Sequence, residues 1–172
     1  MQTTAPPITG DQLTHALHAL GIRFILPCPN VLPAPTLRPS RLIAELAQSS
    51  EARLRLSLVP LFLEHPEYAA AARAIYPRLP AAARLTLACY YTAAYWLQRK
   101  HHQQIEDLLG KTSLLPDHFS HELALATTPD PDQNLALLAQ RQRELSNVAI
   151  NWLGTYQHAA QVWLRALTIE RA

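Results

Sequence analysis

The chain has 172 residues and a formal net charge of +2, with 49% hydrophobic and 16% charged residues. This length suffices for one globular domain with its own core, and so small a net charge does not favour binding to nucleic acid. With only four glycines, the sequence has no glycine-rich phosphate loop, and it has no G-x-S-x-G nucleophile elbow. The common signatures of nucleotide-binding enzymes and serine hydrolases are therefore missing.

The compartment is predicted from apolar runs and cysteines. The longest apolar run covers residues 85–97, which is shorter than the roughly 20 residues that a membrane span needs. The first residues lack the basic start and apolar run of a signal peptide. Cys28 and Cys89 lie far apart and in no C-x-x-C pair, as expected for idle thiols in a reducing compartment. These patterns predict a cytoplasmic protein without a membrane-spanning segment.

Residues 1–39 are predicted to form a tail, one short helix and an extended segment. Asp11 is expected to cap the helix, and Gly21 to end it. Residues 22–26 could form a brief strand. The segment 27–39 contains five prolines in thirteen residues, which excludes a helix and predicts an extended chain suited to lie over a neighbour.

Residues 40–172 are predicted to form an all-helical domain, because alanine and leucine dominate and strand-forming residues are sparse. Three prolines stand where a first-turn proline fits, and they mark helix starts at Pro66, Pro80 and Pro131. Pro60, by contrast, lies inside an apolar helical pattern and is expected to kink or break it.

The helix that starts at residue 80 is predicted to continue to 109 and to stop at Gly110. Further helices are expected over 117–125, 132–145 and about 147–170. The segment ARLRL at 52–56 returns as ARLTL at 83–87, which favours paired helices. The predicted fold is therefore a single all-α domain of six or seven helices. We expect an irregular bundle, or a short array of helix pairs, around a long central helix at 80–109.

The central helix carries the first candidate site. Nearly every position from 85 to 97 is apolar or aromatic, which predicts a helix that is surrounded on most sides by the core. Arg84, Tyr91 and Tyr95 nevertheless share one face at 100° per residue. Because aromatic residues and arginine dominate binding hot spots, these three residues form a candidate interface at the edge of the core.

A second candidate lies in the sequence PDHFSHEL. In a helix, His118 and His121 would share an arc with Asp117 and Glu122, and such a set could bind a divalent metal. The order H-x-x-H-E matches neither of the common zinc-protease motifs, and Asp117 alone would serve as a helix cap. A metal-dependent enzyme that uses His118 and His121 is one alternative function.

Nucleic-acid binding is the other alternative, through Arg99, Lys100, Arg141 and Arg143. The helices that carry these residues are too apolar to lie in a DNA groove, so this function is disfavoured.

The missing catalytic motifs favour a protein that is not an enzyme and needs no cofactor. The aromatic-rich helices and the extended proline segment indicate an interaction with another protein. The sequence therefore predicts a cytoplasmic helical interaction protein or accessory subunit, which acts as a homodimer or binds a different partner.

Overall fold

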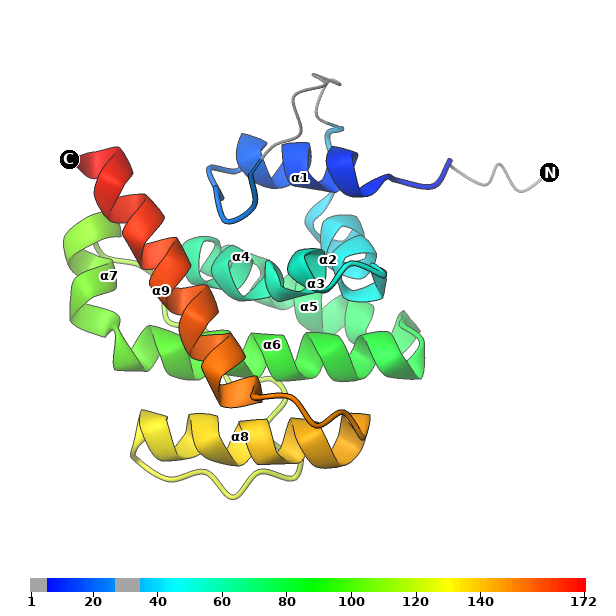
Figure 1. Ribbon diagram of the computed structural model, residues 1–172, viewed down its shortest axis with the longest axis vertical. Helices are drawn as coiled ribbons and strands as arrows, with labels where there is room; N and C mark the ends of the chain where they lie inside the picture. Colours follow the sequence, from blue (N-terminus) through cyan, green and yellow to red (C-terminus); the bar gives the residue numbers. More distant parts are fainter. Residues whose placement is uncertain (1–5, 27–34) are drawn as a thin grey trace.

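A computed structural model describes residues 6–26 and 35–172 of the chain (Figure 1). The described residues form nine α-helices and no strand, which confirms the predicted all-α class and raises the predicted number of helices. The helices are α1 (Gly10–Ala19), α2 (Pro39–Gln48), α3 (Ala52–Leu56), α4 (Leu58–Glu64), α5 (Ala69–Ile75), α6 (Ala81–Lys100), α7 (His102–Leu109), α8 (Pro131–Ser146) and α9 (Trp152–Arg171). Short 3₁₀ turns flank α5 at Pro66–Tyr68 and Tyr76–Arg78.

The helices pack around α6, which runs across the middle of the molecule (Figure 1). On one side α8 runs back along α6 in the opposite direction, and on the other side α4 lies along it. The last helix, α9, crosses α4 and α6 obliquely. The first helix, α1, lies at the end of the molecule that is farthest from α8.

Burial of α6 extends around its whole circumference. Every residue from Leu87 to Ala94 is buried, and so are Trp96, Leu97 and Gln98. Ala88, Ala93 and Ala94 let neighbouring helices approach closely on different sides. A helix that is apolar all round must be covered all round, and this accounts for its central place in the bundle.

The central helix is shorter than the prediction of 80–109. It ends at Lys100, the backbone of His101 leaves the helical conformation, and α7 begins at His102. After this change of direction, α7 buries Ile105 against the bundle. Gly110 has a positive φ of 79° and ends α7, as predicted.

The break at Pro60 is confirmed, but it falls three residues earlier, at Ser57, between α3 and α4. Pro60 thereby occupies the first turn of α4, where no intrahelical partner is needed for its missing N–H. Prolines 66, 80 and 131 stand at or next to the start of helical segments, as predicted.

The N-terminal helix is capped by Thr9 and not by Asp11. The Thr9 hydroxyl accepts from the Gln12 N–H at 3.2 Å, and the Gln12 side chain accepts from the Thr9 N–H at 2.9 Å. This reciprocal capping box explains why the helix starts before the residue predicted as its cap.

The predicted strand at 22–26 is wrong. These residues form turns and bends that bury Ile22 and Ile25 against the helices, and the described residues offer no strand to pair with them. Most of the proline-rich segment, residues 27–34, lies outside the described residues.

The predicted helix at 117–125 is also wrong. The segment forms consecutive turns, and Ala124 adopts a positive φ of 52° that a helix does not allow. Asp117 does cap the first turn, since its carboxylate accepts from the Ser120 N–H at 3.1 Å.

A polar contact joins α4 to α9 inside the otherwise apolar bundle. The Trp163 indole N–H donates to a Glu64 carboxylate oxygen at 2.9 Å, and the Trp163 side chain is buried. Burial raises the pKa of Glu64 above 4.5, while the Trp163 hydrogen bond and the charge of His65 act in the opposite direction.

The raised pKa of Glu64 makes stability depend on pH. The folded chain holds the Glu64 proton more tightly than the unfolded chain, so this contribution to stability is full below pH 4.5 and is lost as the pH rises through the raised pKa. Glu64→Gln keeps an acceptor for Trp163 and removes the ionisation. We expect a smaller fall in the free energy of unfolding from pH 4.5 to pH 7 in this variant, measured by urea unfolding. The exposed Asp107→Asn is the control, and an equal fall in wild type and Glu64→Gln would contradict the prediction.

Candidate functional site

The structure does not bring the predicted interface residues onto one surface. Arg84 is exposed, Tyr91 is fully buried, and Tyr95 is half-buried. The Tyr95 ring is covered by the guanidinium of Arg99, whose central carbon lies 3.5 Å from the ring centre. Arg84 and Tyr91 therefore share a face of α6 without sharing an accessible surface.

Tyr91 belongs to an aromatic cluster in the core. Its ring packs edge-on against Phe62 and Phe119, with centroids 4.9 and 5.2 Å away, and stacks on His118 at 5.2 Å. Its hydroxyl donates to the Pro116 carbonyl at 2.8 Å, and burial raises the pKa of Tyr91. The structure therefore places Tyr91 in the core and not at an interface.

The predicted metal-binding residues face different surroundings. His118 packs on Tyr91, with a buried and unpartnered Nε2 atom and a pKa lowered by burial and by Arg73, whereas His121 is exposed. The neighbouring carboxylate of Glu122 is paired with Arg73. Within the described residues, no group of three histidine, cysteine, aspartate or glutamate side chains is arranged to hold a metal ion.

Most of the basic residues predicted to contact nucleic acid are engaged within the chain. Arg99 donates to the Leu115 carbonyl at 3.2 Å, Lys100 pairs with Asp132 at 2.6 Å, and Arg141 donates to the Leu123 carbonyl at 2.9 Å. Arg143 is exposed. These contacts fasten loops and helices to one another, and they do not form a continuous basic surface.

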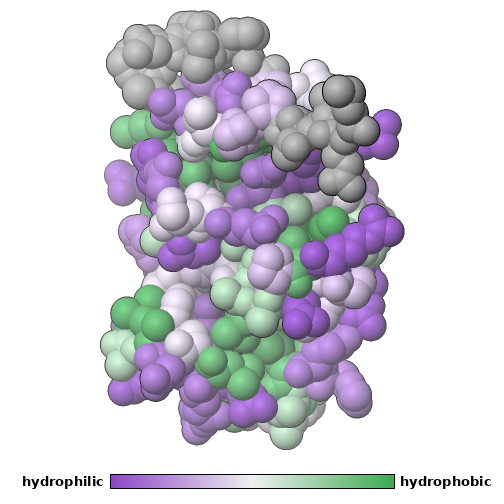
Figure 2. Space-filling view, turned by 90° about the vertical axis from the view of Figure 1, so that its right-hand side faces the viewer, coloured by the Kyte–Doolittle hydropathy of each residue, from purple (hydrophilic) through white to green (hydrophobic). Residues whose placement is uncertain are grey.

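A different surface combines exposure with apolar character. Leu145, Val148 and Ile150 are 44%, 46% and 47% exposed. All three lie within six residues of sequence around the end of α8. Trp152, at the start of α9, is only partly buried beside them. Figure 2 shows apolar side chains gathered in the lower half of the face where α6 begins and α8 ends.

Two hollows that share Trp152 give this surface its shape, and together they are called the apolar groove. The α6–α8 hollow, of about 410 Å³, is lined by Arg55, Ala81, Ala82, Leu85, Thr86, Tyr90, Gln142, Leu145, Ser146, Val148 and Trp152. The α8–α9 hollow, of about 450 Å³, is lined by Ala139, Gln140, Arg143, Ala149, Ile150, Asn151, Trp152 and Leu153. Trp152 is thus the wall between two neighbouring depressions.

The loop that presents the apolar side chains is held at both ends. Asn147 adopts a left-handed conformation that ends α8, and the Asn151 side chain caps α9 by accepting from the Gly154 N–H at 2.9 Å. A Cβ atom at residue 154 would lie 2.5 Å from the Asn151 amide nitrogen, so glycine lets the cap lie close without a shift of the Asn151 side chain. The Trp152 indole donates to the Val148 carbonyl at 3.1 Å. Backbone constraints therefore hold Val148 and its neighbours at the surface.

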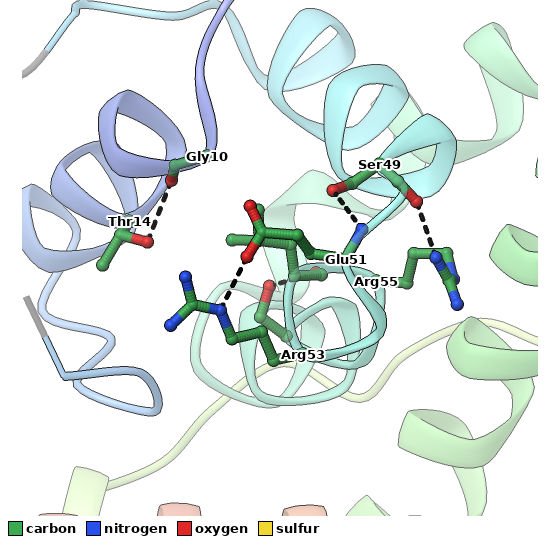
Figure 3. A network of polar contacts seen from close by, with 8 residues as sticks. Gly10, Thr14, Ser49, Glu51, Arg53 and Arg55 are labelled. Carbon is green, nitrogen blue, oxygen red and sulfur yellow. Dashed lines mark hydrogen bonds and ion pairs between the residues drawn. The ribbon is translucent and has the colours of Figure 1, made fainter.

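Hydrogen bonds at the α2–α3 junction position Arg55 at one end of the groove (Figure 3). Its guanidinium donates to the Ser49 carbonyl at the end of α2, at 2.7 Å. The nearby carboxylate of Glu51 is taken by Arg53, at 2.8 Å. Among the described residues, Arg55 has no carboxylate partner.

The groove is basic as well as apolar. No aspartate or glutamate lines either hollow, whereas Arg55 lines one and Arg143 the other. Tyr90 is 5% exposed, and within the described part of the chain no group hydrogen-bonds its hydroxyl. Burial raises the pKa of Tyr90 to about 12, although the nearby Arg55 charge lowers it.

The spacing of apolar residues predicts a helix over about 147–170, with one face formed by Val148, Trp152, Tyr156, Ala160, Trp163 and Leu167, and this gives no sign of the groove. Trp152 is partly buried, and four residues of this face are buried: Tyr156, Ala160, Trp163 and Leu167. Helix α9 starts only at Trp152, however, and leaves Val148 in the loop. The signal that could have revealed this is the pair Asn147 and Asn151, since asparagine favours helix ends on either side of a short break.

A comparison with known proteins finds no matching protein-family model and no match among curated proteins or solved structures. None of the helices among the described residues combines the length and apolar character needed to cross a membrane.

Substitutions at Tyr91 separate a core role from an interface role. Tyr91→Ala removes a fully buried ring, and we expect a loss of about 3–5 kcal/mol in the free energy of unfolding. Tyr91→Phe removes only the hydroxyl and its bond to Pro116, so we expect a loss of about 1 kcal/mol. Chemical denaturation measures both, and a loss below about 1 kcal/mol for Tyr91→Ala would contradict the core assignment.

Proposed function

We propose that this chain is a non-enzymatic interaction protein or accessory subunit that holds an apolar segment of a partner protein in the apolar groove. The observation that carries this proposal is the exposure of Leu145, Val148 and Ile150 around two adjacent hollows. The cytoplasmic location expected from the sequence belongs to the same proposal.

The physical argument starts from the cost of exposing apolar side chains to water. Large contiguous apolar patches are rare on monomeric proteins and often mark interaction sites, whereas scattered exposed leucines need no explanation. Here three large aliphatic side chains lie near Trp152, with Leu145 in the last turn of α8 and with Val148 and Ile150 in the loop between the two helix caps. Aromatic side chains such as Trp152 contribute large contact areas at protein interfaces.

The lining of the groove also favours binding over catalysis. Among the described residues that line it there is no histidine, cysteine, aspartate or glutamate, which are the groups that most often transfer protons or act as nucleophiles. Its ionisable groups are Arg55, Arg143 and Tyr90, and burial makes Tyr90 a weaker acid. Such a surface is suited to recognition.

The proposal is tested with a variant that loses apolar contact area without gaining charge. We expect Leu145→Ser combined with Val148→Ser to fold with a melting temperature close to that of the wild type, because both side chains are substantially exposed. A protein that co-purifies in stoichiometric amount with the tagged wild-type chain from its native cell should be absent from the variant preparation.

The matched control replaces two exposed apolar residues outside the groove. Leu114→Ser combined with Ile169→Ser removes side chains that are 55% and 68% exposed, and this variant should keep the partner. A partner retained equally by both variants would place the interaction elsewhere. Purification of the wild-type chain without any protein partner would contradict the proposed function.

A further inference from the structure

The groove contains hydrogen-bond donors in addition to its apolar surface. Arg55 and Tyr90 line the same hollow, and the Arg55 charge lowers the pKa of Tyr90 against the larger effect of burial. The guanidinium of Arg55 has donors beyond the one that binds Ser49, and the Tyr90 hydroxyl is a further donor without a partner in the described chain. These donors are therefore available to an anionic group of a ligand.

Both hollows of the groove carry positive charge. Arg143 lines the second hollow, on the far side of Trp152 from Arg55, and no carboxylate lines either hollow. Two glutamates lie close to these arginines in the sequence, and in the described structure each pairs with another arginine. Glu51 binds Arg53, and Glu144 binds Arg141. An apolar surface therefore lies between two available cations.

We propose that the partner segment is an acidic amphipathic helix, whose apolar side chains enter the two hollows and whose aspartate or glutamate binds Arg55 and the Tyr90 hydroxyl. This inference rests on the proposed function of the groove and adds the chemistry of its occupant. A helix is favoured because helices form the walls and the described residues include no strand edge to which an extended segment could add. A second acidic residue on the same helix meets Arg143.

A second copy of this chain fits the groove less well. Interfaces between proteins pair potentials of opposite sign, and a two-fold dimer presents the same patch from both partners. Two copies of this groove would bring arginines together without a carboxylate in either lining. The charge distribution thus favours a different partner over the homodimer that the sequence left open.

The test uses a displayed library of helical peptides about 18 residues long, or roughly 27 Å of helix. One face carries randomised apolar residues, and the flanking positions are randomised equally among acidic, basic and neutral residues. Peptides that bind the wild-type chain but not the Leu145→Ser, Val148→Ser variant are groove-dependent. We expect these peptides to be enriched in aspartate and glutamate at the flanks, and to bind more weakly as salt increases.

Two variants of the chain test whether the carboxylate of the peptide binds Arg55 and Tyr90. Tyr90→Phe keeps the ring, which packs edge-on against Tyr156, and removes only the hydroxyl. Arg55→Gln removes the charge. Because hydrogen bonds to charged groups are stronger than neutral ones, we expect each variant to weaken the binding of a selected acidic peptide about tenfold. Arg165→Gln, which removes an exposed arginine that lines neither hollow, is the control for Arg55→Gln and should leave affinity unchanged. Thermal unfolding of each variant separates lost binding from lost folding.

Each other outcome overturns a defined part of the argument. Groove-dependent peptides without acidic enrichment overturn the acidic partner and leave the proposed function intact. The same follows if acidic peptides bind Tyr90→Phe and Arg55→Gln as tightly as they bind the wild type. A library that yields no groove-dependent peptide overturns both. If sedimentation shows a wild-type dimer that Leu145→Ser with Val148→Ser converts to monomer, the occupant is a second copy and the inference is wrong.

Discussion

The complete burial of α6 is the constraint on which the rest of the fold depends. A helix without a solvent-exposed side from Leu87 to Ala94 needs neighbours around its whole circumference. Several of its buried polar side chains bind inside the protein, although the buried Trp96 indole N–H has no partner among the described residues. The Thr92 hydroxyl donates to the Ala88 carbonyl of its own helix at 2.7 Å. Gln98 instead binds the Ser113 carbonyl and the Leu115 N–H, at 2.9 and 2.8 Å. The hydrogen bonds of Gln98 thus hold an irregular segment of the chain along α6.

The apolar groove lies where the cover over α6 stops. Helix α8 follows α6 back toward its start but ends at Ser146, and α9 begins at Trp152 and then crosses toward the other end of the molecule (Figure 1). Ala81, Ala82 and Leu85, in the first turns of α6, consequently line a hollow that no helix fills. The site of proposed binding is therefore a consequence of the same packing that stabilises the core.

The aromatic residues of α6 show why composition alone is ambiguous about function. Tyrosine beside arginine is typical of binding hot spots, and the same residue types fill cores when a hydroxyl finds an internal acceptor. Tyr91 donates to the Pro116 carbonyl and belongs to the core, whereas Tyr90, one residue away, lines the groove, and its hydroxyl has no partner among the described residues. His118 was a candidate metal ligand but packs on Tyr91, and Glu122 pairs with Arg73.

The sequence by itself determined the helical class, the helix starts at Pro80 and Pro131, and the helix end at Gly110. These features follow from the backbone preferences of single residues and from side chains within one turn, so they can be read locally. Only the tertiary structure decided that the chain breaks at His101, that 117–125 forms turns, and that Val148 is exposed. Those outcomes depend on which surfaces meet across long separations in sequence, where the burial of Ile105 or Phe119 outweighs local helix preference.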